Sequence, residues 1–242
     1  MGESVTKPSQ PLVIEFVGLP GAGKTTVFHQ VVAQLREEGI SVAARDEILK
    51  QWKSTGRVKK LLQLLPQTWN HVQTLVQSLV LASQVKPLNR QSFAKAVKVY
   101  TNVKRIDAIA QSRSHQLIVL DQGLLQEIWS VGITGKPPET KQIQRELSTL
   151  FQTRSVAIVD FNIDVETALQ RIQQRPTEGS RFDVMESDAA QATLTRYGPY
   201  LQDILRCAQT LGIPLLEVDS ALSVEEKAEK IVLWMHSLIR AI

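Results

Sequence analysis

The segment GLPGAGKT at residues 18–25 carries the clearest chemical signal, because it fits the pattern G-x-x-x-x-G-K-[ST]. Glycines in such a loop let backbone N–H groups turn around phosphate oxygens, since no Cβ stands in the way. We expect Lys24 to reach the β- and γ-phosphates of a bound triphosphate and the Thr25 hydroxyl to hold Mg²⁺. The predicted nucleotide-binding residues are Gly18, Leu19, Pro20, Gly21, Ala22, Gly23, Lys24, Thr25 and Thr26.

Three carboxylates follow apolar runs that read as strands. Asp121 follows QLIVL, where a carboxylate can hold Mg²⁺ or its water shell, or can instead cap the next helix. Asp46 and Glu47 follow SVAAR, and either could accept the proton of an acceptor hydroxyl or orient the acceptor. The alternative for this pair is a helix cap with a first-turn acid. We predict Asp121 as a metal residue and leave the role of the pair open.

Arginines gather after the fourth predicted strand. Arg171 and Arg175 are four residues apart, so they share a helix face, and Arg181 follows a short loop. Phosphoryl transfer spreads negative charge over equatorial oxygens, which arginines stabilise. A loop that carries them can close over ATP and exclude water, so residues 171–188 are predicted as a lid. The alternative is a solvated basic helix end.

Apolar runs and helical periodicities alternate along the chain and must position these residues. Strands are predicted at residues 12–17, 41–45, 116–120, 155–161 and 214–218. Helices are predicted near residues 24–38, 66–80, 90–106, 124–130, 139–151, 164–175, 189–211 and 223–240. Because the strands are apolar throughout, they indicate a parallel sheet covered on both faces, which binds ligands at the carboxyl ends of its strands.

The composition indicates one ordinary globular domain. The 242 residues are 43% hydrophobic and 21% charged, with a net charge of +4 and one cysteine. We expect a disordered tail at residues 1–11 and a single domain at 12–242, with a helical acceptor-side region near 48–112. The single cysteine fits a reducing compartment, so a cytoplasmic location is expected. Aromatic residues are 5% of the chain and do not interleave with basic ones, and no apolar run reaches transmembrane length, so neither nucleic acid nor membrane is an expected partner.

The sequence resembles the P-loop nucleoside and nucleotide kinases, above all thymidylate kinase. The resemblance lies in ALQRIQQR at residues 168–175, in Arg181-Phe182-Asp183, and in the strand and helix at residues 214–231. It implies a three-layer α/β/α P-loop NTPase fold with a five-stranded parallel sheet in the order 2-3-1-4-5 and a helical insertion after strand 2. It also implies ATP at residues 18–25, transition-state contacts from Arg171, Arg175 and Arg181, and Mg²⁺ or acid chemistry at Asp121.

The acceptor side departs from that family. Thymidylate kinases follow the strand-three acid with an arginine that touches the acceptor phosphate, whereas this sequence has Gln122. We expect an ATP- and Mg²⁺-dependent phosphotransferase whose small acceptor is a nucleoside or nucleotide. The alternatives are a kinase of a non-nucleotide hydroxyl compound and a nucleotide-binding regulatory protein without kinase activity. The apolar helices of residues 66–110 are compatible with a homodimer. The predicted catalytic residues are Lys24, Asp46, Glu47, Asp121, Arg171, Arg175 and Arg181.

Overall fold

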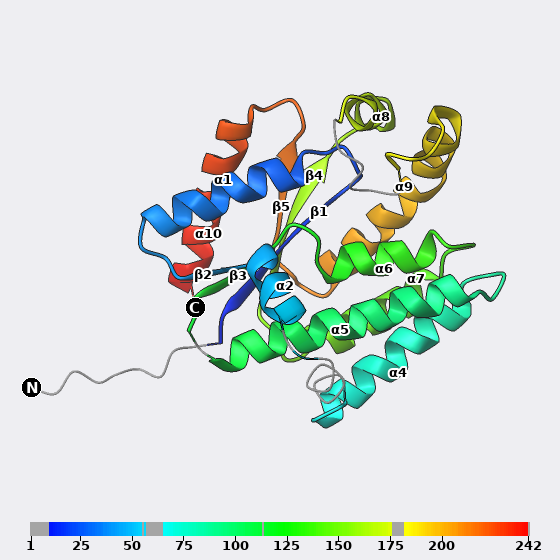
Figure 1. Ribbon diagram of the computed structural model, residues 1–242, viewed down its shortest axis with the longest axis horizontal. Helices are drawn as coiled ribbons and strands as arrows, with labels where there is room; N and C mark the ends of the chain where they lie inside the picture. The colour runs from blue at the N-terminus through cyan, green and yellow to red at the C-terminus, as the bar shows by residue number, and fades with distance from the viewer. Residues whose placement is uncertain (1–9, 55, 57–64, 113, 176–181, 242) are drawn as a thin grey trace, which may run out of the picture.

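A five-stranded parallel sheet forms the centre of the computed structural model (Figure 1). The structure describes residues 10–54, 56, 65–112, 114–175 and 182–241. The strands are β1 (Leu12–Gly18), β2 (Val42–Ala44), β3 (Leu117–Leu120), β4 (Val156–Asn162) and β5 (Leu215–Asp219). Their order is β2-β3-β1-β4-β5, and every neighbouring pair is parallel, which confirms the predicted fold class and strand order.

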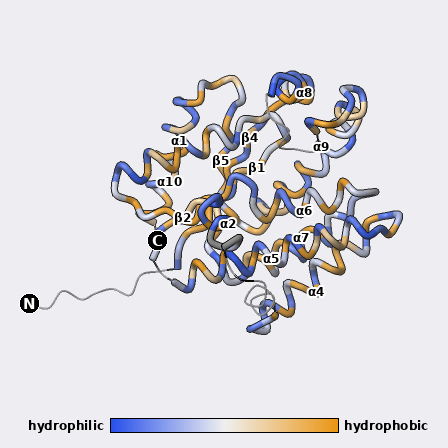
Figure 2. The backbone as a smooth tube through the Cα atoms, viewed as in Figure 1, coloured by the Kyte–Doolittle hydropathy of each residue, from blue (hydrophilic) through white to orange (hydrophobic). Residues whose placement is uncertain are grey.

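The core lies where the apolar strands meet their helical covers. All residues of β1, β2 and β3 are buried, and β4 is buried except for its last residue. Figure 2 shows hydrophobic residues running through these central strands. In the register of the sheet, Val13 of β1 lies beside Ile118 of β3 on one side and Val156 of β4 on the other. Such strands need cover on both faces, because neither face carries the polar residues that water would require.

Helices supply that cover in two layers. They are α1 (Lys24–Glu37), α2 (Arg45–Ser54), α4 (Trp69–Gln84), α5 (Arg90–Ser112), α6 (Leu124–Gly132), α7 (Thr140–Phe151), α8 (Val165–Gln173), α9 (Ser187–Thr210) and α10 (Val224–Ala241). Helices α1 and α10 pack together on one side of the sheet, and α4 to α7 with α9 lie on the other (Figure 1). None of the helices in the described part of the chain has the length and apolar character needed to span a membrane.

Local signals set several helix ends as the sequence predicts. Gly39 follows α1 with φ +81°, the left-handed conformation of a C-terminal cap. Asp164 accepts a hydrogen bond from the backbone N–H of Thr167 at 2.8 Å and so caps α8. Ser223 and Glu226 bond each other's backbone N–H groups in a capping box at the start of α10.

The length of the second strand differs from the sequence-based expectation, and the sequence did not indicate which side of α4 is buried. The second strand is shorter than predicted, because Arg45 already begins α2 and both acids that follow lie in its first turn. In α4, Val76 and Val80 are exposed, whereas Ser78 is fully buried. The Ser78 hydroxyl donates a 2.7 Å hydrogen bond to the buried carboxyl of Glu146 on α7, and Leu81 and Ala82 are buried on the same helix, so the inward side of α4 combines a polar contact with apolar packing.

Candidate active site

The loop between β1 and α1 forms a phosphate-sized turn with its backbone close to α8. Gly21 and Gly23 have φ values of +91° and +84°, a conformation that residues with a Cβ atom rarely adopt. A Cβ placed on Gly21 would lie 2.4 Å from the carbonyl oxygen of Ala168 in α8. The chain then enters α1 at Lys24, so the positive end of that helix's dipole faces the turn.

Lys24 lies folded over this loop. Its Nζ donates hydrogen bonds to the carbonyl oxygens of Gly18 at 2.7 Å and Leu19 at 2.9 Å. Burial lowers the pKa of Lys24 to about 7, and repulsion by Arg175 acts in the same direction, whereas Asp121 and Asp160 oppose it. The ammonium group therefore stands between the turn and two nearby carboxylates.

The strand-end acid Asp121 meets the loop directly. The Thr25 hydroxyl donates to Asp121 Oδ2 at 3.0 Å, and Arg45 Nη1 lies 3.3 Å from Asp121 Oδ1. Asp121 is 4% exposed, so both oxygens are held in place by these partners. A hydroxyl and a carboxylate side by side are the hard oxygen donors that Mg²⁺ prefers, with water or phosphate oxygens completing its coordination. No group of three or more His, Cys, Asp or Glu side chains within the described residues could hold a metal ion.

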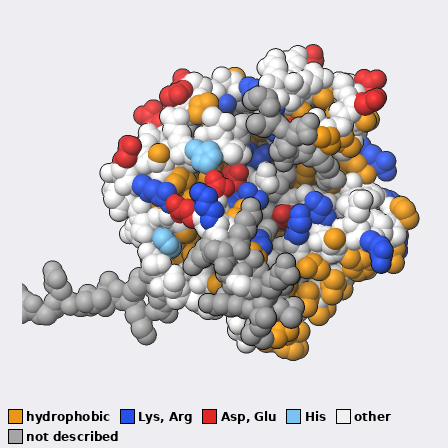
Figure 3. Space-filling view, in the orientation of Figure 1, with side chains coloured by type: hydrophobic (Ala, Val, Ile, Leu, Met, Phe, Trp, Pro, Cys, Tyr) orange, Lys and Arg blue, Asp and Glu red, His pale blue; other side chains and the backbone are white. Residues whose placement is uncertain are grey.

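A cavity of about 640 Å³ opens in front of the loop. One wall is the loop with Lys24 and Thr25, and Arg175 stands at the same wall. The other walls come from α2, α5 and α6, and they include Arg45, Lys95 and Trp129. Side chains of Lys and Arg gather near the centre of this face in the space-filling view (Figure 3). The cavity thus lies between the loop and walls that carry further cationic side chains.

The predicted site residues divide between this cavity and its surroundings. Arg175 lines the cavity and lies 3.6 Å from Asp183. Arg171 points elsewhere, since its Nη2 donates to the carbonyl oxygen of Ser220 at 3.3 Å, beside α10. Arg181 and residues 1–9 of the predicted tail lie outside the described residues.

The acidic pair after β2 also lies outside the cavity lining. Asp46 is 4.0 Å from His29, and Glu47 pairs with Arg36 at 2.7 Å, on the flank of α1. The Arg36 hydrogen bond and a backbone N–H outweigh partial burial and hold the pKa of Glu47 below its usual value. The neighbouring Arg45, the first residue of α2, reaches the cavity instead.

Comparison with known proteins places the chain in a family. The sequence matches the AAA_33 family, an AAA domain, over residues 13–199, which is most of the chain. The chain belongs to this AAA domain family. No curated protein sequence matches it significantly.

Two solved structures are similar in outline to this AAA domain. Deoxyadenosine kinase from M. mycoides with products dCMP and a flexible dCDP bound has 14% sequence identity and a TM-score of 0.48. The same enzyme with bound dATP also has 14% identity, with a TM-score of 0.43. Each alignment covers 93% of this chain and 99% of the other. At such values neither likeness bears on function.

The AAA domain holds a buried carboxyl group behind the cavity that the sequence analysis did not single out. Glu15 in β1 accepts hydrogen bonds from the backbone N–H groups of Leu125 at 2.6 Å and Gln126 at 3.3 Å, so it caps α6. Burial raises the pKa of Glu15 to about 8, against the effect of these hydrogen bonds. A Cβ on Gly123 would lie 2.4 Å from Glu15 Cδ, so a side chain at this position would displace the carboxyl group. A lone acid within an apolar strand is the only signal that could have indicated it.

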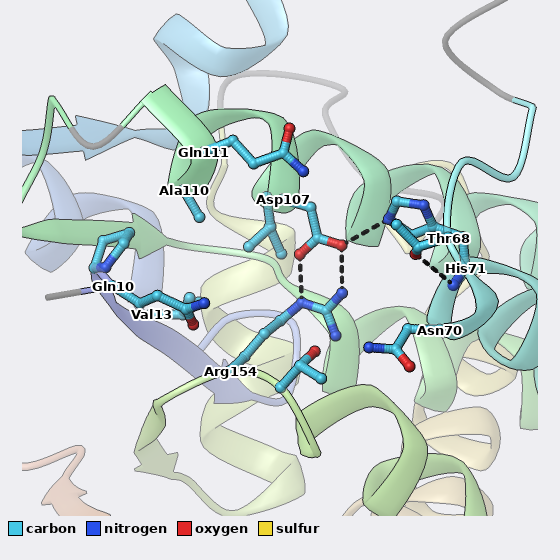
Figure 4. Close-up of a pocket in the computed structure, with 12 residues that line it drawn as sticks. Gln10, Val13, Thr68, Asn70, His71, Asp107, Ala110, Gln111 and Arg154 are labelled. Atoms are coloured by element: carbon cyan, nitrogen blue, oxygen red, sulfur yellow. Dashed lines mark hydrogen bonds and ion pairs between the residues drawn. The ribbon is translucent and has the colours of Figure 1, made fainter.

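A second cavity of about 280 Å³ lies at the amino-terminal edge of the sheet (Figure 4). The carboxylate of Asp107 on α5 accepts two hydrogen bonds. Arg154 Nε donates to Oδ1 at 2.7 Å, and His71 Nε2 donates to Oδ2 at 2.9 Å. Lys104 Nζ and the Gln67 backbone N–H both point at His71 Nδ1, so that nitrogen accepts and Nε2 carries the proton. The network joins α4, α5 and the segment just before β4, and each of these side chains has a partner within it, which indicates a structural clamp.

Proposed function

We propose that this AAA domain is a phosphotransferase that moves the γ-phosphoryl group of ATP, bound with Mg²⁺, to a small acceptor, a nucleoside or nucleotide. One observation carries the proposal. The cavity that begins at Lys24 and Thr25 continues to walls built by α5 and α6, so a second substrate can lie beside the end of a triphosphate. A protein that only hydrolyses or senses a nucleotide needs no such second compartment.

The roles follow from where the side chains lie. Backbone N–H groups of residues 18–26 and the Lys24 ammonium bind the triphosphate. Thr25 and Asp121 hold Mg²⁺, which neutralises phosphate charge when it is bound. Arg175 offsets the charge of the transferring group, together with Arg181 if the loop that carries it closes.

Four predicted catalytic residues need a change of partner before they can act, and the first is Lys24, which donates to loop carbonyl oxygens. Asp46 and Glu47 would have to leave His29 and Arg36, and Arg171 would have to leave the Ser220 carbonyl. We assign the binding of the triphosphate to the loop and Arg175, and we propose residues 171–188 as a lid and 48–112 as the acceptor-side region of a single domain spanning 12–242.

Replacement of Lys24 by alanine tests the proposal. Phosphoryl transfer to a panel of nucleosides, nucleotides, sugars and antibiotic hydroxyl compounds, measured as ADP release, should fall at least about 100-fold, since the proposal assigns Lys24 to the phosphates of ATP. Lys141→Ala, on the exposed side of α7, is the matched control. Full turnover by Lys24→Ala would refute the assignment, and nucleotide binding by the unaltered protein without transfer to any acceptor would favour a regulatory protein.

A homodimer through α4 in the cytoplasm is part of the same proposal. Trp69 is 71% exposed and Val76 is 49% exposed, and hydrophobic side chains cover this region in Figure 3. The helix Trp69–Gln84 contains no Asp, Glu, Lys or Arg, which is unusual for a helix that faces water. Val76→Asp should convert a dimer to a monomer in light scattering, and an unchanged mass would exclude this face as the interface.

A further inference from the structure

Helix α6 begins without a capping side chain of its own. Its N-cap residue is Gly123, which has no side chain to offer to the helix. The first N–H groups of a helix need partners, and a polar side chain at the N-cap usually supplies one. Here the partner comes from another element, because Glu15 Oε1 accepts from the backbone N–H of Leu125 at 2.6 Å and of Gln126 at 3.3 Å. The start of α6 therefore depends on a residue of the central strand.

Glu15 lies beside both segments that form the proposed triphosphate site. It comes three residues before Gly18, where the phosphate-binding loop begins. In the register of the sheet it pairs with Leu120, the residue before Asp121. Its carboxyl group also occupies the place that a Cβ on Gly123 would take, since the two would be 2.4 Å apart. One side chain thus joins β1, the end of β3 and the start of α6.

The same helix start forms a wall of the cavity in front of the loop. Gln126 and Glu127 line this cavity, and both belong to the beginning of α6. The later part of the helix is held from elsewhere, because Trp129 Nε1 donates to the carbonyl oxygen of Tyr197 in α9 at 2.9 Å. The hydrogen bonds of Glu15 therefore act on the part of the wall that lies nearest to β3.

We propose that Glu15 is a positioning residue for phosphoryl transfer, which fixes the first turn of α6 against the strand that carries the phosphate-binding loop. The inference rests on the proposed phosphotransferase function, because that function places the second substrate against the α6 wall. Glu15 is 1% exposed and is not part of the cavity lining, so it acts through the backbone of α6. Such indirect control matters because phosphoryl transfer needs the attacking atom, the phosphorus and the leaving oxygen in line.

Two replacements separate the hydrogen bonds of Glu15 from its acidity. Burial raises the pKa of Glu15 to about 8, so at pH 7 the group is mainly a neutral acid that still accepts the two N–H groups. Glu15→Ala removes that acceptor, and kcat for any acceptor that the unaltered protein phosphorylates should fall at least about tenfold. Glu15→Gln presents an amide oxygen at the same place and should restore kcat to within about twofold. Calorimetry should give both variants a Kd for Mg·ATP within about twofold of the unaltered protein, because the loop itself is unchanged.

Two further variants distinguish positioning from stability. Ile14 is fully buried, and its side chain points to the opposite face of the sheet because side chains alternate along a strand. Ile14→Val should therefore lower the melting temperature and keep kcat. Gly123→Ala displaces the carboxyl group from the other side and should reproduce the loss of kcat. The double variant of Glu15→Ala and Gly123→Ala should lose no more than the larger single loss, because both changes break the same contact.

Two outcomes would overturn the inference while the phosphotransferase function stands. One is an unchanged kcat in Glu15→Ala well below its melting temperature, which would make Glu15 a cap that serves stability alone. Should that variant fail to fold, a full kcat in Gly123→Ala has the same consequence. The other is an equal loss of kcat in Glu15→Gln and Glu15→Ala, since the hydrogen bonds to α6 would then not be what the reaction needs. Calorimetric binding of Mg·ATP by the unaltered protein without transfer to any acceptor would instead overturn the proposed function, and the inference with it.

Discussion

Glu15 is buried inside the central strand, and its replacement by glutamine should change how the stability of the fold depends on pH. The carboxyl group loses its proton near pH 4.5 in the unfolded chain, whereas burial raises the pKa in the folded protein to about 8. The folded state therefore holds one more proton than the unfolded state across this window. Stability from this group is complete below pH 4.5 and is lost as the pH rises through 8.

The size of the effect follows from the two pKa values. Between pH 5 and pH 8 the free energy of unfolding should fall by on the order of 3 kcal/mol because of this group alone. Glutamine has nearly the same shape and cannot titrate, so Glu15→Gln should lack this loss. Other titrating groups affect both proteins alike, so the difference between the two pH profiles isolates Glu15.

Urea unfolding followed by tryptophan fluorescence at pH 5, 6, 7 and 8 measures these profiles. Glu229→Gln, on the exposed side of α10, controls for the removal of one carboxylate. We expect the Glu15→Gln profile to gain on the unaltered protein steadily from pH 5 to pH 8, while the control follows the unaltered protein. Two parallel profiles for Glu15→Gln and the unaltered protein would refute the reasoning, because they would mean that the buried carboxyl titrates alike in both states.

Three further predictions concern packing and helix ends. Gly21→Ala should lower the melting temperature more than Gly23→Ala, because both glycines have positive φ but a Cβ strikes backbone only at Gly21; equal losses would contradict the close approach. Arg154→Ala should lower the free energy of unfolding in urea by about 3 kcal/mol through loss of a buried ion pair, against a much smaller loss for exposed Arg145→Ala; matching losses would mean that the pair adds no stability. Asp164→Ala should cost about 1 kcal/mol in the same assay through loss of the α8 cap, and an unchanged midpoint would show that the cap is dispensable.

The parallel sheet could be predicted because each strand is an apolar run followed by a polar group, whereas the strand order came from the resemblance to the P-loop kinases. The same rule predicted that Thr25 and Asp121 would meet, since the carboxyl ends of β1 and β3 lie next to each other. Capping residues such as Asp164 could also be predicted, because their hydrogen bonds join residues only a few positions apart in the sequence. Wherever the determining contact was local or followed from sheet topology, the sequence was sufficient.

Long-range contacts explain what could not be predicted. Nothing in the spacing of Lys95 and Lys98 says that α5 turns that side toward the loop, because the choice depends on packing against α6. The burial of Ser78 depends on a carboxyl group 68 residues away. Helix α2 begins at Arg45, and Asp46 and Glu47 lie outside the cavity lining. A shift of one or two residues in the start of a helix changes the direction in which its side chains point.

Because Gly21 has no side chain, the backbone of the turn lies directly against the backbone of α8. Because main chain rests on main chain there, no flexible group stands between them to absorb a displacement. A displacement of the turn would therefore press directly on the backbone of α8, and Arg175, which lines the cavity, lies just beyond the end of that helix.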